Sequence, residues 1–149
     1  LERDSNMYLP DVLYSISKEL AKDYLKLIYL DTVCMNMDRH TKNYGVLRNP
    51  ETGEIVKLAP NYDNNIALIS RGYPRFIERN KDTLIDLFIE LLESNIEALR
   101  LFKDINVPVI TDELVRKCIS ETPFVVDGDK ISQFILNGQK RVLDFLDNN

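Results

Sequence analysis

Residues 38–63 read DRHTKNYGVLRNPETGEIVKLAPNYD, and they decide how the whole chain is interpreted. Within this stretch, two short β-prone runs, 44–47 (YGVL) and 55–58 (IVKL), stand on either side of the loop 49–53, which contains Pro and Gly. Runs of this kind around a Pro- and Gly-bearing loop are typical of a β-hairpin. The sequence therefore predicts one hairpin, with a polar loop at each of its ends.

Upstream of the hairpin, apolar residues recur every three or four positions, as on the buried face of a helix: Leu13, Ile16, Leu20, Tyr24 and Leu27. Pro10 lies where the first turn of a helix tolerates a residue without an N–H. We expect one helix to run from there to about Cys34. Three lysines spaced four apart fall on another face, which we expect to meet solvent: Lys18, Lys22 and Lys26.

Downstream of the hairpin, residues that commonly cap helices precede three further helical patterns: Asp82, Thr111, and Asp127 or Asp129. We expect a weak point at residues 94–95, and the second of these helices should end near residue 120. Gly138 falls inside the last helix and costs about 1 kcal/mol relative to Ala. The predicted fold class is mainly α with one β-hairpin.

Length and composition exclude several classes of protein. The chain has 149 residues, of which 44% are hydrophobic, and we expect one domain over residues 1–149. Its net charge of −5 argues against duplex DNA, so no direct nucleic-acid binding is predicted. No apolar run approaches the roughly 20 residues that cross a bilayer, and no membrane partner is predicted. Two cysteines without a CxxC pair favour a reduced, cytoplasmic setting.

The two polar loops carry three residues suited to one kind of chemistry: Asp38, Asn43 and Asp63. A hairpin brings the start of its first strand near the end of its second, so these side chains can converge although Asp63 follows Asn43 by twenty residues. Phosphoryl transfer needs a carboxylate that accepts the proton of the attacking hydroxyl and oxygen ligands that hold Mg²⁺. Mg²⁺ prefers hard oxygen donors, which the three side chains supply.

Protein kinases have these residues in the same order, with a catalytic Asp, an Asn five residues later, and a metal-binding Asp after a hairpin. Taken singly, the residues have a simpler explanation. Asp38 after a helix and Asn43 in a turn are common in loops of any protein. The spacing, the hairpin and the second Asp together favour the catalytic interpretation.

Residues 36–43 (NMDRHTKN) and 58–63 (LAPNYD) resemble the C-terminal region of HipA-like serine/threonine kinases, and the likeness covers about residues 28–68. The resemblance implies the large, C-terminal lobe of a protein-kinase-like fold. It also implies that Asp38 is the catalytic base and that Asn43 and Asp63 bind Mg²⁺ and, through it, ATP. The Asp-Arg-His run further resembles the catalytic loop of phosphatidylinositol 3- and 4-kinases, but LAPNYD favours the HipA-like side.

Two more residues of the first loop are candidates for the site. His40 is the only histidine, and a histidine can relay protons near neutral pH. The alternative, which we favour, is that it braces the loop that carries Asp38, and we interpret Asn36 in the same way. Lys42 could face phosphate charge or simply meet solvent. The basic segment 71–79 follows Asp63, where kinases contact substrate, although a solvated loop is the simpler interpretation.

The chain also departs from a complete kinase. Asn64 follows Asp63 where DFG has Phe, and no Gly-rich phosphate loop precedes Asp38. We therefore expect the large lobe alone of a longer protein, inactive without its own N-terminal lobe. The expected substrates are ATP and a protein Ser or Thr hydroxyl, and the family often has an antitoxin partner. The alternatives are a pseudokinase-like binding or regulatory module and a lipid or small-molecule kinase.

Overall fold

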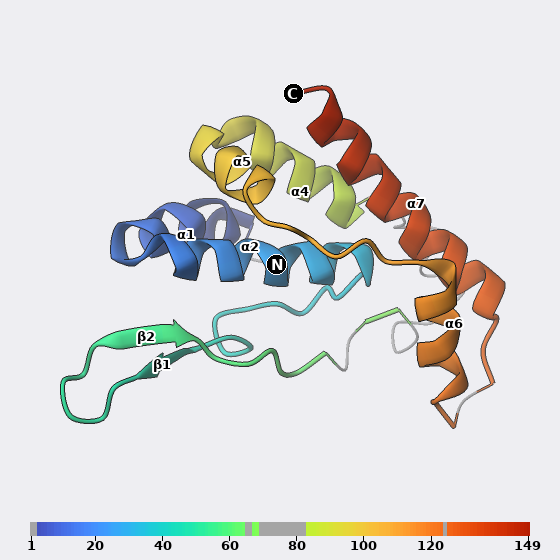
Figure 1. The fold of residues 1–149 in the computed structure, drawn as a ribbon, viewed down its shortest axis with the longest axis horizontal. Helices are drawn as coiled ribbons and strands as arrows, with labels where there is room; N and C mark the ends of the chain where they lie inside the picture. Colours follow the sequence, from blue (N-terminus) through green and yellow to red (C-terminus); the bar gives the residue numbers. More distant parts are fainter. Residues whose placement is uncertain (1–2, 65–66, 69–82, 124) are drawn as a thin grey trace.

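The computed structural model describes residues 3–64, 67–68, 83–123 and 125–149. Within these ranges the chain forms six helices and one antiparallel two-stranded hairpin (Figure 1). The helices are α1 (Arg3–Ile16), α2 (Lys18–Val33), α4 (Thr83–Ser94), α5 (Ile96–Lys103), α6 (Asp112–Ser120) and α7 (Gly128–Asp147). The predicted class, mainly α with one hairpin, is confirmed.

The prediction of a single helix before the hairpin is wrong, because Ser17 interrupts the helix. This residue is extended, with φ −161° and ψ 133°, and it separates α1 from α2. Pro10 is not in a first turn but is the eighth residue of the 14-residue α1. Ile16, expected in the core, is 51% exposed at the end of α1. The apolar spacing continues across the break, which is why periodicity alone does not reveal it.

Helix α2 is the centre of the core and packs against α1, α4, α5, α7 and β2. It is buried on more than the predicted face, since Ala21, Leu25 and Val33 are all fully enclosed. Tyr29 of α2 meets Phe88 and Phe102 with ring centroids 6.0 and 5.4 Å away. The end of α2 is therefore fixed by packing from several sides.

Two of the three lysines expected in solvent, Lys18 and Lys26, are exposed as predicted. The third, Lys22, is only partly so, because 17% of its side chain is accessible and its ammonium lies 3.9 Å from Asp104. A lysine can bury its alkyl stem while its ammonium still reaches an ion pair. The predicted exposure is therefore confirmed for Lys18 and Lys26, whereas Lys22, between them, is partly buried.

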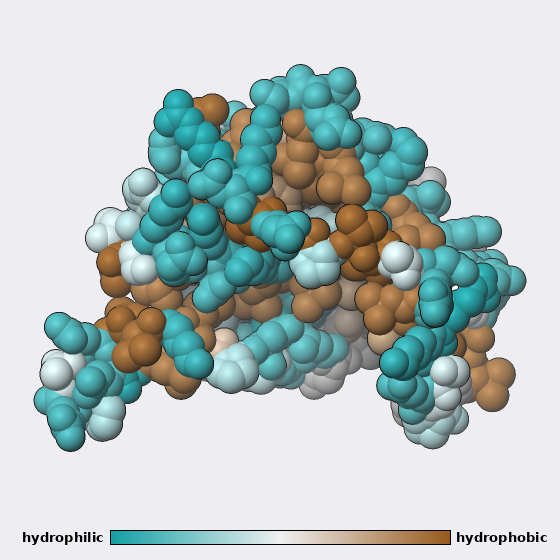
Figure 2. Space-filling model, viewed as in Figure 1, coloured by the Kyte–Doolittle hydropathy of each residue, from teal (hydrophilic) through white to brown (hydrophobic). Residues whose placement is uncertain are grey.

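The predicted hairpin is confirmed as β1 (Val46–Arg48) and β2 (Ile55–Leu58), with Val46 opposite Leu58. Gly53 in the connecting loop has φ +73°, a conformation that glycine adopts without strain. The hairpin projects from the helices at the lower left of Figure 1. On the face shown in Figure 2, apolar side chains lie over it, and Leu47 and Val56 are exposed.

The predicted break and two of the caps after the hairpin are also confirmed. Helix α4 ends at Ser94, and Asn95 caps α5 by accepting from the Ala98 N–H at 2.9 Å. Thr111 caps α6, and Asp127, not Asp129, caps α7. The cap expected at Asp82 lies outside the described residues. In the described part of the chain, no helix has the length and apolar character needed to span a membrane.

Candidate active site

The first loop of the candidate site begins where α2 ends. Met35 has φ +52°, its N–H donates to the Thr32 carbonyl at 3.3 Å, and the Asn36 N–H donates to the Asp31 carbonyl at 2.8 Å. These two bonds form a Schellman motif, in which glycine is the usual left-handed residue. Met35 is instead 2% exposed and packs with Leu84, so its side chain anchors the turn in the core.

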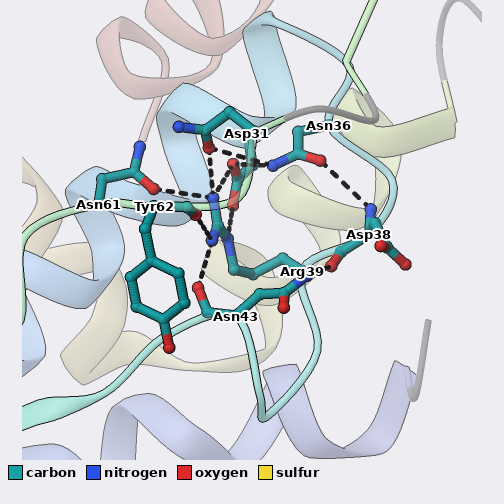
Figure 3. Close-up of polar contacts among 8 residues, drawn as sticks. Asp31, Asn36, Asp38, Arg39, Asn43, Asn61 and Tyr62 are labelled. Atoms are coloured by element: carbon teal, nitrogen blue, oxygen red, sulfur yellow. Dashed lines mark hydrogen bonds and ion pairs between the residues drawn. The ribbon is translucent and has the colours of Figure 1, made fainter. Parts of the chain in front are cut away.

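Arg39 lies at the centre of the site and is only 4% exposed (Figure 3). It forms a two-point ion pair with Asp31 of α2, from Nε to Oδ2 at 2.6 Å and from Nη2 to Oδ1 at 2.8 Å. The hydrogen bonding of its guanidinium to Asp31 is the main reason that the pKa of Arg39 is raised, and the charge of Asp63 contributes less. The guanidinium therefore remains charged and is fixed to the end of α2.

The remaining contacts of Arg39 join the two loops. Its Nη1 donates to the carbonyl of Asn43 in the first loop and to the carbonyl of Tyr62 in the second, the latter at 2.9 Å. Its Nη2 donates to the side-chain oxygens of Asn61, at 3.0 Å, and Asn64, at 2.8 Å. Six acceptors therefore surround the five N–H donors of this arginine, so all five donors are used and one hydrogen of Nη2 is shared between two oxygens.

Asp38 is fixed through its backbone. Its carbonyl accepts from Asn43 Nδ2 at 2.8 Å, and its N–H donates to Asn36 Oδ1 at 3.4 Å. Asn36 also donates to Asp31 Oδ1 at 2.8 Å, so it has the bracing contacts that the sequence predicts. The Asp38 carboxylate is half-buried and points away from the Arg39 contacts in Figure 3. It is therefore held in place without being used in the ion pair.

The two predicted magnesium ligands differ in their surroundings. Asn43 is 4% exposed, and because its amide nitrogen bonds the Asp38 carbonyl, it would bind a cation through Oδ1. Asp63 is exposed and has φ +56°, a left-handed conformation that is uncommon for a residue other than glycine. Hydrogen bonds join Asn43 to Asp38, and Arg39 links the Asn43 carbonyl to that of Tyr62, the residue before Asp63.

His40 and Lys42 are both exposed. His40 Nδ1 accepts from the Lys42 N–H at 3.2 Å, and the Tyr62 hydroxyl donates to the Lys42 carbonyl at 3.0 Å. The first bond lies within the first loop, and the second, which involves Lys42 but not His40, joins the two loops. A catalytic role for either side chain stays a prediction. The basic segment 71–79 lies outside the described residues.

The sequence interpretation missed Asp31 and Arg39, although a signal for both is present. Leu20, Tyr24 and Leu27 mark the buried face of α2, and Asp31 continues their spacing. A carboxylate on a buried face needs a charged partner, since an unpaired buried charge is costly. Arg39 is the first arginine after it in the sequence.

The oxygen atoms of the site suit Mg²⁺ bound together with a nucleotide. Among the described residues, no group of three or more His, Cys, Asp and Glu side chains could hold a metal ion by itself. Mg²⁺ commonly takes one or two protein carboxylates and completes its shell with water and phosphate oxygens. The Asn43 amide and the Asp63 carboxylate fit that need by their chemistry.

Comparisons of the chain with protein-family models, with curated proteins and with solved structures gave no significant match. Overall similarity therefore assigns no family, and a functional interpretation depends on the residues of the two loops.

Proposed function

We propose that this chain is the large lobe of an ATP- and Mg²⁺-dependent HipA-like kinase that phosphorylates a protein Ser or Thr hydroxyl. Asp38 is the catalytic base, and Asn43 and Asp63 are the magnesium ligands. His40 braces the loop, and the exposed Lys42 is available to phosphate charge. On this proposal, most nucleotide contacts come from an N-terminal lobe, and the 149-residue chain alone is inactive.

One observation carries the proposal. The carbonyl of Asn43 and the carbonyl of Tyr62, the residue before Asp63, accept from the same nitrogen of Arg39. Two loops separated by the hairpin therefore meet at one buried guanidinium. A site that needs a base and two metal ligands from different loops needs such a junction.

The proposed reaction is an in-line displacement. The substrate hydroxyl oxygen forms a bond to the γ-phosphorus, the bond from that phosphorus to the β,γ-bridging oxygen breaks, and ADP departs. The hydroxyl proton passes to the Asp38 carboxylate. When bound, Mg²⁺ would stabilise the negative charge of the phosphate groups. Asp38 suits its role because its backbone N–H and carbonyl are both hydrogen-bonded, which restricts where the carboxylate can lie.

The test is phosphoryl transfer from labelled ATP by the complete protein of which this lobe is a part. Asp38→Ala and Asp63→Ala should each lower the rate by about 100-fold or more, the usual effect of removing a general base or a metal ligand. Glu51→Ala, at an exposed position in the hairpin loop, is the matched control and should retain full activity.

Full activity in both aspartate variants would refute these roles. If the complete protein bound no nucleotide at millimolar Mg²⁺-ATP, the pseudokinase-like binding module would replace the kinase as the better interpretation.

A further inference from the structure

We infer that Arg39, held by Asp31, is the positioning residue that aims Asp63 at the metal; this inference rests on the proposed function. Arg39 touches no reacting atom. It acts on Asp63 through the two neighbours of that residue, because the Tyr62 carbonyl and the Asn64 side chain both accept from its guanidinium, at 2.9 and 2.8 Å.

The backbone of Asp63 supports this role. Its φ of +56° lies in the left-handed region, which is unfavourable for a residue with a Cβ, although Asp adopts it more readily than most residues. Contacts on both sides of Asp63 therefore favour this conformation over the extended alternatives. For the residue before and the residue after Asp63 to reach one buried guanidinium, the chain must turn sharply between them. The left-handed Asp63 is that turn, and Arg39 supplies the contacts on both sides of it.

The charges of the group leave both catalytic carboxylates available. Arg39 is neutralised by Asp31, whose side chain is 6% exposed, and its other acceptors are uncharged carbonyl and amide oxygens. A guanidinium that instead paired with Asp63 would compete with Mg²⁺ for that carboxylate, and one that paired with Asp38 would make that carboxylate a weaker base. Because Asp31 balances its charge, Arg39 can hold the two loops together without forming an ion pair with the Asp63 carboxylate, which stays available to the metal.

Lysine cannot replace this arginine. An ammonium has three donors at one point, whereas the guanidinium spreads five donors over a planar fork that reaches Asp31 and both loops at once. Arg39→Lys should therefore release Asp63 while keeping the positive charge beside Asp31. Arg48→Lys is the matched control, because Arg48 is an exposed arginine of β1 that donates to the Gly53 carbonyl at 2.9 Å.

The direct test is NMR of the 149-residue chain, using the one-bond Cα–Hα coupling of Asp63, which distinguishes positive from negative φ. Asp63 should have positive φ in the unaltered chain and in Arg48→Lys, and should lose it in Arg39→Lys. A folded Arg39→Lys chain in which Asp63 keeps positive φ would overturn the inference. If Arg39→Lys does not fold, Asn64→Ala decides in the same way, since Asn64 is exposed and its side chain is one of the two anchors.

A second readout uses the complete protein and Mg²⁺-ATP. Arg39→Lys should raise the Mg²⁺ concentration needed for half-maximal activity by about 10- to 100-fold, as for other residues that orient metal ligands. An unchanged Mg²⁺ requirement in an active variant would contradict the inference. If the unaltered protein shows no Mg²⁺-ATP activity, the proposed function fails, and the Asp63 coupling still decides whether Arg39 positions that residue.

Discussion

Arg39 and Asp31 form a two-point ion pair whose side chains are 3% and 6% exposed, at the junction of α2 with both loops of the candidate site. Removing one partner of a buried pair leaves the other charge without compensation, which costs about 3–5 kcal/mol. Asp31→Asn should therefore lower the free energy of unfolding by about 3 kcal/mol in urea titrations.

The control for this variant is Asp104→Asn. Asp104 pairs with Lys18 at 3.1 Å and lies 3.9 Å from the ammonium of the partly buried Lys22, but its own side chain is 55% exposed. Exposed pairs contribute about 0–1 kcal/mol, so the control should change the unfolding midpoint little. Equal changes in the free energy of unfolding for the two substitutions would show that the buried Arg39–Asp31 pair stabilises the fold no more than an exposed pair does.

Gly138 lets α7 approach α4 closely. A Cβ at this position would lie 3.0 Å from Ile85 Cδ1. Helix propensity favours Gly138→Ala by about 1 kcal/mol, but crowding in a packed core costs about 1–3 kcal/mol, so we expect a net loss of stability. Ile85→Val removes the crowded methyl group and should make Gly138→Ala neutral or stabilising. The thermal unfolding of all four combinations tests this, and strictly additive effects would contradict it.

Tyr29 should make the fold sensitive to alkaline pH. Burial raises the pKa of Tyr29 to about 12, against an ordinary value of about 10. The pKa of Tyr29 is higher in the folded than in the unfolded chain. Its contribution to the free energy of unfolding is therefore complete below about pH 10 and is lost as the pH rises to about 12. We expect a loss of about 2 kcal/mol over that interval.

Urea titrations at about pH 9 and about pH 11.5, which bracket most of this interval, measure the decline. Tyr29→Phe should lessen it, whereas Tyr14→Phe, at a tyrosine that is 42% exposed, should leave it unchanged. Identical pH profiles for the unaltered chain and Tyr29→Phe would count against this assignment.

The two cysteines should differ in reactivity. Burial and, to a lesser extent, the charge of Asp31 raise the pKa of Cys34 to about 11, whereas Cys118 is exposed. Only the thiolate is alkylated readily, so at about pH 8 iodoacetamide should modify Cys118 first and Cys34 only slowly. Mass spectrometry of timed samples measures this order. Equal rates in the folded chain would show that Cys34 is more accessible than its surroundings indicate.

The hairpin and the helix caps could be predicted because they depend on nearby residues. The side chains of Thr111 and Asp127 each cap a helix by accepting from the backbone N–H three residues later. The hairpin is marked by its Pro- and Gly-bearing loop. The break at Ser17 could not be predicted in this way. Leu13 and Leu20 on its two sides are both buried, so their spacing looks like one continuous helix.

The candidate site was predictable only in part. Asp38, Asn43 and Asp63 stand out because their spacing matches a chemical need, but the group that joins their loops depends on tertiary contacts. Arg39 reaches acceptors up to 25 residues away in the sequence, and no local pattern specifies that distance. The left-handed Met35 is similar, because packing against Leu84 allows a residue where glycine is usual.

The central claim is that Asp63 holds Mg²⁺ and Asp38 accepts the proton. The most direct measurement is the rate of phosphoryl transfer by the complete protein over a series of Mg²⁺ concentrations, with Asp63→Asn and Asp38→Asn compared with the unaltered protein. We predict that Asp63→Asn needs about tenfold or more Mg²⁺ to reach half of its maximal rate. Asp38→Asn should keep the normal Mg²⁺ requirement but react about 100-fold or more slowly at saturation. Unaltered rates and Mg²⁺ requirements in both variants would contradict the account.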